Sequence, residues 1–355
     1  MIAASSKSDQ TQRRGELGVL PKWQQLLADA IKDPHELCRE LELDEATLAG
    51  ALAAARDFPL RVPRSFVAKM RRGDPRDPLL LQVLPTLAEL NPADGFIRDP
   101  VGDLDSRATR GLLHKYSGRA LLVATGACAV HCRYCFRRHF PYDEESALFD
   151  NWRNVLEHLQ ADTSISEVIL SGGDPLSLSD RRLRDLVERV QAIPHVRRLR
   201  IHTRYPIVLP ERVDSAFVAW LADVSLQKVV VIHANHPREL DDAVQKALND
   251  LRKAGVTLLN QSVLLAGVND DATTLAELSE RLFACGVLPY YLHLLDRVAG
   301  AAHFEVPECR ASALHAELMA KLPGYLIPRL VREVPGAASK TPITSTGTSV
   351  STSVS

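Results

Sequence analysis

The chain has 355 residues, which is long enough for two or three domains or for one large α/β barrel with an added region. Hydrophobic residues make up 46% and charged residues 25%, the balance of an ordinary globular protein. The net charge of −1 provides no global field toward phosphate or lipid, so we expect no nucleic-acid and no membrane partner. Six cysteines are too few for a disulfide scaffold, yet three of them fall within eight residues.

The two ends of the chain lack the apolar surface that folding requires. The N-terminal residues contain no apolar core of a signal peptide, and residues 344–355 are entirely Ser, Thr, Gly and Val. The composition predicts a disordered leader over residues 1–20, a disordered tail over residues 344–355 and a cytoplasmic location.

Residues 21–115 have a helical pattern interrupted by loops. Apolar residues recur at i, i+3 and i+4 spacing from Trp23 to Ile31, which predicts an amphipathic helix. A second helix is predicted from Asp44, a suitable N-cap, to Ala55. The region carries no chemical motif, so we expect it to be a packing layer.

Residues 116–343 alternate between short β-rich runs and helical patterns. Repeated βα units predict a parallel sheet with right-handed crossovers, closed into a full or partial barrel or left open and doubly wound. In either case ligands gather at the C-terminal ends of the strands. The predicted strands are 120–125, 167–170, 199–203, 228–233, 256–263 and 289–295. The predicted helices are 147–160, 180–192, 211–221, 240–254, 273–285 and 310–322.

The loop after the first predicted strand reads GACAVHCRYCFRRHF, in which Cys128, Cys132 and Cys135 have the spacing C-x₃-C-x₂-C. Structural zinc sites use four ligands, usually two separated pairs, and His131 is badly placed as a fourth because it adjoins Cys132. Three cysteines suit a 4Fe–4S cluster with one iron left open. Cys38, Cys285 and Cys309 are isolated, and we interpret them as ordinary buried or surface thiols.

Two further segments have the composition of ligand-binding turns. The second predicted strand ends in LSGGDPL, with Gly172, Gly173 and Asp174, where glycines allow a backbone to approach a ligand closely. The segment REVPGAASKTP carries Lys340 among small residues, and an accessible lysine can form a Schiff base with an aldehyde cofactor. His233 ends the fourth predicted strand, either as part of the same cleft or as a hydrogen-bonded strand end.

The ordered landmarks resemble the lysine 2,3-aminomutase family of radical S-adenosylmethionine (SAM) enzymes. The resemblance covers about residues 89–342 and implies a partial (β/α)6 TIM-like barrel with an N-terminal helical region. It also implies a core over residues 116–343, the three cofactors 4Fe–4S cluster, SAM and pyridoxal 5′-phosphate (PLP), and an isomerase activity. The landmarks are HKYSGRALL, CxxxCxxCFRR, LSGGDPL, RYPIVLP, HANHPREL, NQSVLLAGVND, PYYLHLLD and PGAASKTP.

The resemblance assigns roles to individual residues. It implies that Cys128, Cys132 and Cys135 bind the cluster, while Gly172, Gly173, Asp174 and His233 bind SAM. It implies that Lys340, Arg119 and Gln261 bind PLP, and that Arg137, Asp296 and Glu333 bind the substrate. Lys115 stands where better known members have arginine, which weakens its expected part in phosphate binding.

The substrate and partners are also implied by the resemblance. Two carboxylates, Asp296 and Glu333, match the cationic tail of L-lysine, whereas a glutamate substrate would be repelled. Glu333 replaces an aspartate of the free-lysine mutases, and the chain ends 15 residues after Lys340. Both features resemble the elongation factor P β-lysylation subgroup (EpmB type), which makes (R)-β-lysine from (S)-α-lysine for a separate lysyl ligase.

Three alternatives remain open from the sequence. A free-lysine mutase of catabolism or osmolyte synthesis would use the same chemistry without elongation factor P. A radical SAM enzyme of another reaction class would not need Lys340 or the paired acids. A zinc-binding scaffold would use the three cysteines alone and would not account for the second cofactor loop.

Overall fold

The computed structural model describes residues 20–145 and 152–343. Residues 1–19 of the predicted leader, the predicted tail and the predicted helix start at residues 147–151 lie outside the described residues.

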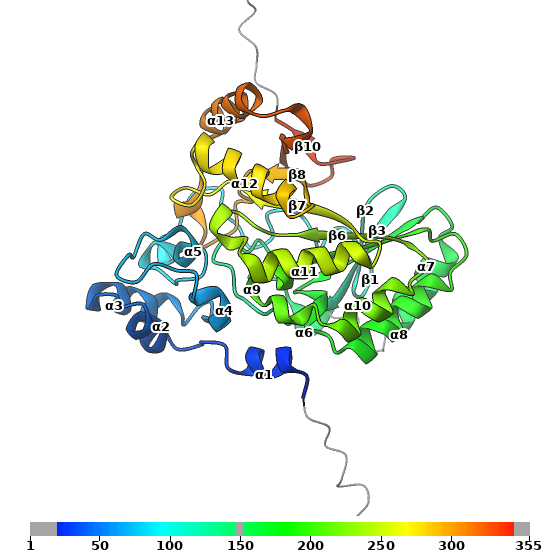
Figure 1. Cartoon of the computed structure of the whole chain (residues 1–355). Helices are drawn as coiled ribbons and strands as arrows, with labels where there is room; N and C mark the ends of the chain where they lie inside the picture. The colour runs from blue at the N-terminus through cyan, green and yellow to red at the C-terminus, as the bar shows by residue number, and fades with distance from the viewer. Residues whose placement is uncertain (1–19, 146–151, 344–355) are drawn as a thin grey trace, which may run out of the picture.

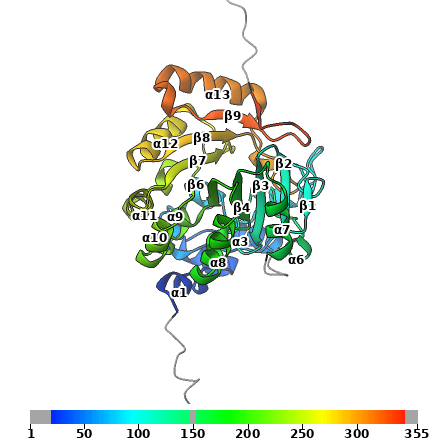
Figure 2. The same cartoon turned by 90° about the vertical axis from the view of Figure 1, so that its right-hand side faces the viewer.

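One curved sheet of ten strands, arranged in chain order, organises the described part of the chain (Figures 1 and 2). Neighbours from β3 to β9 pair in parallel, while β1, β2 and β3 pair antiparallel, as do β9 and β10. No strand pairing in the described residues joins β1 to β10, so the barrel is partial. The strands are β1 (Arg107–Thr109), β2 (Leu112–Tyr116), β3 (Arg119–Thr125), β4 (Glu167–Gly172), β5 (Arg198–Thr203), β6 (Gln227–Ile232), β7 (Thr257–Val263), β8 (Leu288–His293), β9 (Arg329–Arg332) and β10 (Thr341–Pro342).

Six crossover helices connect the parallel strands, one in each interval from β3 to β9. This arrangement confirms the predicted α/β fold with six βα units. The crossover helices are α7 (Arg153–Ala161), α8 (Asp180–Gln191), α10 (Ser215–Ala222), α11 (Asp242–Lys253), α12 (Ala272–Ala284) and α13 (Glu308–Lys321). Two short helices, α6 (Tyr142–Glu145) and α9 (Tyr205–Val208), follow β3 and β5.

The N-terminal helices lie at one end of the molecule and α13 at the opposite end (Figures 1 and 2). The main hydrophobic core includes Trp23, Ile31 and Phe66 together with the buried residues of β3 to β7, so the helical region packs directly on the barrel. Asp44 is the N-cap that the sequence predicts, because its carboxylate accepts the Thr47 amide at 2.8 Å. The N-terminal elements are α1 (Lys22–Ala28), α2 (Pro34–Glu40), α3 (Glu45–Ala54), α4 (Arg64–Val67), α5 (Pro78–Leu81) and the 3₁₀ turn η2 (Leu87–Leu90).

The structure differs from the predicted elements at both edges of the sheet. Residues 107–116 form β1 and β2 within the segment predicted to be helical, because these short strands gain a partner in β3 that no local pattern reveals. At the other edge, β9 adds a seventh parallel strand after α13 and leads to Glu333 and Lys340. None of the helices in the described part combines the length and apolar character needed to cross a bilayer.

Candidate active site

The cysteine loop follows β3 and is fastened to the N-terminal helical region. Arg133 is completely buried and donates from Nη2 to Oε2 of Glu89 at 2.6 Å, and Arg138 donates to the same oxygen at 2.9 Å. Removing one partner of such a buried pair leaves a costly uncompensated charge. The pairing therefore fixes the position of the loop relative to η2, which carries Glu89.

The three cysteine sulfurs face one region but do not surround a single ion. Burial, and next the charge of Cys132, raise the pKa of Cys135 to about 11, and the pKa of Cys128 responds to both other thiols. Among the described residues, no set of three ligand atoms within 4.8 Å of one another includes these cysteines. Zinc, with Zn–S bonds of about 2.3 Å, would hold its sulfurs roughly 4 Å apart. A cluster, which binds each cysteine through a different iron, fits the wider spacing.

His131, the other candidate ligand in the loop, is held against the N-terminal region. Its Nδ1 lies 2.8 Å from the Pro59 carbonyl oxygen, and its ring stacks on Phe58 with centroids 5.2 Å apart. These contacts fix the orientation of the ring and engage only one of its two nitrogens. Cys38 and Cys285 are buried and Cys309 is exposed, as expected for thiols outside the site.

The glycines at the end of β4 pack against the backbone of the cysteine loop. A Cβ atom on Gly172, whose φ is 111°, would lie 2.7 Å from the Thr125 oxygen, and one on Gly173 would lie 2.5 Å from the Ala127 oxygen. The Gly173 amide donates to Thr125 at 2.7 Å, and the Asp174 amide donates to Ala127 at 2.8 Å. Only glycine permits this approach, so the motif fixes the end of β4 beside the cysteines.

The Asp174 carboxylate holds the ends of β4 and β5 together. It accepts Thr203 Oγ1 at 2.7 Å and the Arg204 amide at 2.7 Å. Burial raises the pKa of Asp174 to about 6, although these hydrogen bonds act in the opposite direction. The adjoining Gly172 carbonyl accepts the Tyr142 hydroxyl at 2.8 Å. The predicted SAM motif is thus a rigid junction between two strand ends and the cysteine loop.

A chain of alternating charges crosses the site from the cysteine loop to the C-terminal loop. Arg137 Nε donates to Asp103 Oδ2 at 2.6 Å, and Lys115 Nζ lies 2.7 Å from Asp103 Oδ1. Lys115 Nζ is also 3.7 Å from Glu333 Oε1, and Glu333 Oε2 accepts a hydrogen bond from Lys340 Nζ at 2.6 Å. Each charge in this series lies beside a charge of opposite sign, and the three cations and two anions leave a net charge of +1. The structure therefore connects three residues of the predicted site, Arg137, Glu333 and Lys340. The connection runs through Asp103 and Lys115, which were not predicted to link them.

The pKa values in this series of charges follow from the charge of each residue's neighbour. Burial alone would raise the pKa of Asp103, but Arg137 and Lys115 lower it below the ordinary value. Burial would likewise raise the pKa of Glu333, and Lys340 lowers it. Burial would lower the pKa of Arg137, and Asp103 raises it. Both carboxylates are therefore ionised, and the positive charge of Arg137 is retained.

Asp296 lies within electrostatic range of this chain but has no direct partner. Among the described residues, its carboxylate makes no hydrogen bond or ion pair. Burial raises its pKa to about 7, Lys340 lowers it and Glu333 raises it. A carboxylate held in this way gains most from a cationic ligand, because the ligand supplies the missing partner.

Polar side chains from neighbouring strands line the space beside Lys340. Gln261 Nε2 lies 3.1 Å from His233 Nε2, and the His202 and His233 rings are 6.1 Å apart. Burial, with added repulsion from Arg204 and Lys340, lowers the pKa of His233 to about 3, so the ring is neutral. Nε2 of His202 and of His293 are buried without a partner in the described residues. Orphaned polar atoms of this kind mark a space that suits a polar ligand.

The predicted PLP residues lie on both sides of this space. Lys340 Nζ is 5.8 Å from the Tyr291 ring centroid, and Tyr291 pairs with Gln261 in the sheet. Arg119 stacks its guanidinium on Tyr116 at 4.6 Å, and the Tyr116 hydroxyl donates to Glu333 at 2.6 Å. The contact between His233 and Gln261 places His233 on this side of the site, and no hydrogen bond in the described residues joins its side chain to Gly172–Asp174.

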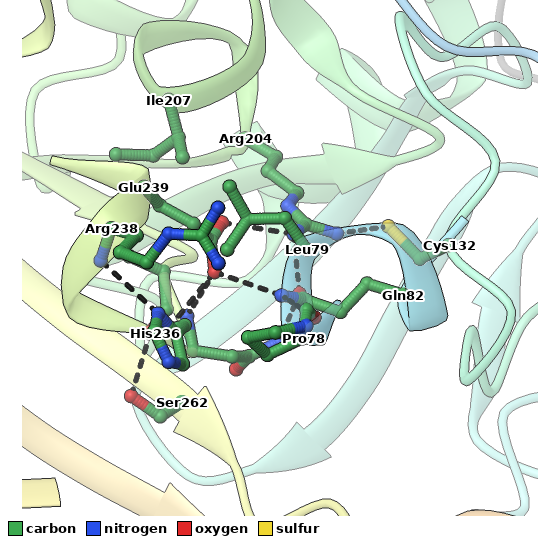
Figure 3. A network of polar contacts seen from close by, with 12 residues as sticks. Pro78, Leu79, Gln82, Cys132, Arg204, Ile207, His236, Arg238, Glu239 and Ser262 are labelled. Carbon is green, nitrogen blue, oxygen red and sulfur yellow. Dashed lines mark hydrogen bonds and ion pairs between the residues drawn. The ribbon is translucent and has the colours of Figure 1, made fainter. Parts of the chain in front are cut away.

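Two important residues were missed by sequence reasoning. Asp103 follows Gly102 in an irregular loop, and nothing in its local pattern distinguishes it from a surface acid. Arg204 stands in the RYPIVLP landmark, which was a usable signal, and it contacts Cys132, Gln82 and Glu239 (Figure 3).

Comparisons with known proteins agree with this geometry. Residues 122–278 match the Radical SAM superfamily. L-lysine 2,3-aminomutase of Escherichia coli is 51% identical over 90% of this chain and 94% of its own length, and that of Haemophilus influenzae is 47% identical over the same shares. L-lysine 2,3-aminomutase of Clostridium subterminale is 32% identical over 90% of this chain and 77% of its own length.

The partial barrel, the three-cysteine loop and the superfamily match define a radical SAM enzyme, with the cluster and SAM that this class uses. Within that class the extent of identity is decisive. The chain belongs to the lysine 2,3-aminomutase family and is an isomerase.

We expect Asp296→Asn to stabilise the cofactor-free protein at pH 7.5 and to do so less at pH 5. The folded-state pKa of Asp296 is about 7, above the ordinary value of about 3.9. Between these values the unfolded chain has released the proton that the folded chain retains, so the stability of the wild-type protein falls as the pH rises through this window. Asparagine cannot ionise, so the Asp296→Asn variant does not lose stability as the pH rises through this window.

The measurement is the thermal midpoint at both pH values. Asp223→Asn, the same change at an exposed position, serves as the control. An equal effect of Asp296→Asn at the two pH values would contradict the assignment of the raised pKa.

Proposed function

We propose that the chain is an L-lysine 2,3-aminomutase that converts (S)-α-lysine to (R)-β-lysine with a 4Fe–4S cluster, SAM and PLP. The observation that carries the substrate assignment is the charge order from Arg137 to Glu333, with Asp296 within electrostatic range. Lysine has a carboxylate at one end and a second ammonium at the other, which complements a buried arginine and a pair of carboxylates.

The donor sets fit the three groups. Cys128, Cys132 and Cys135 would bind the cluster and leave one iron open for SAM. Gly172, Gly173 and Asp174 would border SAM beside the loop, with His233 on the side of the second cofactor. Lys340 would hold PLP through its amine, with Arg119 and Gln261 toward the phosphate. Support for the PLP site comes from the unpartnered Nε2 atoms of His202 and His293 beside Lys340.

When bound, the cluster and SAM supply the radical that removes and returns a hydrogen, and PLP supplies the π-system across which the amino group migrates. The residues of the chain orient the substrate. Arg137, whose planar fork suits a carboxylate, would exchange Asp103 for the substrate carboxylate. Glu333 and Asp296 would accept the distal ammonium, which fixes the substrate at both ends.

Lys340 also controls whether Glu333 is available. In the present structure Lys340 Nζ occupies one oxygen of Glu333 at 2.6 Å, which is the partner that the substrate ammonium needs. Holding PLP would draw the Lys340 amine away from Glu333. The distal ammonium of the substrate would then take the place of this amine on the carboxylate.

We further propose that the product is used to modify elongation factor P through its lysyl ligase, in the cytoplasm. Support comes from Glu333, which stands where the free-lysine mutases have aspartate. The cluster thiols also need a reducing compartment. A free-lysine mutase remains the second candidate, with the same site chemistry.

Lys340→Ala should retain the iron and SAM binding of the parent enzyme and lose formation of β-lysine, because the neighbouring amine of Lys115 is already paired with Asp103 at 2.7 Å. Anaerobically reconstituted protein would be incubated with lysine, SAM, PLP and a strong reductant, and the products separated by chromatography. Glutamate and arginine serve as competing substrates. Lys246→Ala, an exposed lysine of α11, is the matched control. Undiminished β-lysine from Lys340→Ala would refute the PLP assignment.

Glu333→Gln should raise the KM for lysine by roughly 10- to 100-fold, because a hydrogen bond to a charged group contributes about 1.5–3 kcal/mol. Initial rates over a range of lysine concentrations measure the effect, and PLP absorbance reports separately whether the cofactor is loaded. Glu308→Gln, an exposed carboxylate on α13, is the control. An unchanged KM with full PLP loading would place the substrate ammonium elsewhere.

Deleting the gene should remove the β-lysyl mass increment from elongation factor P, which intact-protein mass spectrometry measures. Supplying (R)-β-lysine to the deletion strain should restore the increment, since the ligase is still present. Unchanged modification in the deletion strain would favour the free-lysine mutase and would leave the aminomutase activity itself unaffected.

A further inference from the structure

Arg204 connects the second cysteine of the loop to the interior of the barrel. It follows β5 directly, and its Nη1 donates to Cys132 Sγ at 2.8 Å and to the Tyr134 hydroxyl at 2.7 Å. The side chain is only 6% exposed, so water does not screen this contact. Figure 3 shows a dashed line from the Arg204 guanidinium to the sulfur of Cys132.

A buried network holds the guanidinium in this orientation. Arg204 Nη2 donates to Gln82 Oε1 at 2.6 Å and to Glu239 Oε2 at 3.0 Å. Gln82 Nε2 donates to the other oxygen of Glu239 at 3.1 Å, and Asn235 Nδ2 donates to Gln82 at 3.0 Å. Gln82 and Glu239 are completely buried. These partners belong to the end of α5 and the turn after β6, so two separate segments fix one arginine.

A fixed positive donor on a cluster sulfur has an electrostatic consequence. Adding an electron makes the cluster more negative, and hydrogen bonds to the sulfurs and nearby charge set the potential at which this happens. Arginine keeps its charge at all physiological pH values. In a buried site with a low effective dielectric, that charge stabilises the reduced form more than it would in water.

We propose that Arg204 is a positioning residue that sets the reduction potential of the cluster through its hydrogen bond to Cys132. The inference rests on the proposed cluster at Cys128, Cys132 and Cys135. Glu239 acts on the potential in the opposite direction to Arg204, because its carboxylate partly compensates the charge of the arginine. One electron enters the oxidised cluster from an external low-potential one-electron donor, and Arg204 transfers neither proton nor electron.

The test is a mediated redox titration of the anaerobically reconstituted enzyme, read by electron paramagnetic resonance, on wild type, Arg204→Gln and Glu239→Gln. Arg204→Gln should lower the equilibrium constant for one-electron reduction about tenfold, a shift of about 59 mV to more negative potential. Glu239→Gln should shift the potential in the opposite direction. Arg212→Gln, which removes a completely buried arginine that instead donates to the Leu176 carbonyl, is the control and should leave the potential unchanged.

Iron and sulfide content and the thermal midpoint, measured on the same samples, separate the outcomes. A wild-type protein that assembles no cluster defeats the proposed function itself. If Arg204→Gln and Glu239→Gln both assemble clusters that have the wild-type reduction potential, the role of Arg204 is overturned and the proposed function is unaffected. If Arg204→Gln fails to assemble a cluster, Glu239→Gln decides: a positive shift supports the inference, and an unchanged potential overturns it.

Discussion

The site depends on one continuous series of buried and partly buried charges, from Arg137 through Asp103, Lys115 and Glu333 to Lys340. The series joins the cysteine loop, the segment before β1, β2, the end of β9 and the C-terminal loop. Each of these charges has lost much of its water, so each depends on the next for compensation. The two cofactor ends of the site, far apart in sequence, are thereby coupled through electrostatics as well as through the sheet.

A ligand that enters such a site exchanges partners and does not simply fill a space. In the proposed mode of binding, a substrate carboxylate would compete with Asp103 for Arg137, and an ammonium would compete with Lys340 for Glu333. Asp296 is different, because it has no partner to lose and its pKa of about 7 leaves it ready to ionise beside a cation. Asp296 is thus the carboxylate that the protein leaves without a direct partner, and in the proposed mode of binding it would favour a substrate with a cationic tail.

The sequence alone predicted what local patterns encode and missed what distant pairing creates. The cysteine spacing, the glycine turn and the six βα units each lie within a short window, and the last of these is confirmed by the sheet. The hairpin of β1 and β2 was missed because strands of three and five residues have too little periodicity. Asp103 was missed for a related reason: its partner Arg137 is 34 residues away, and Tyr116 and Glu333 meet across 217 residues.

The two ends of the site are supported to very different degrees. The cysteine loop is fastened by the buried pairs of Glu89 with Arg133 and Arg138, so displacing it exposes several unpaired charges. The lysine loop, in contrast, is closed by the two exposed residues of β10. Local opening costs least where few buried contacts are lost. Local opening is therefore least costly at the Lys340 end, where the proposed binding of a cofactor would exchange the Lys340–Glu333 pair.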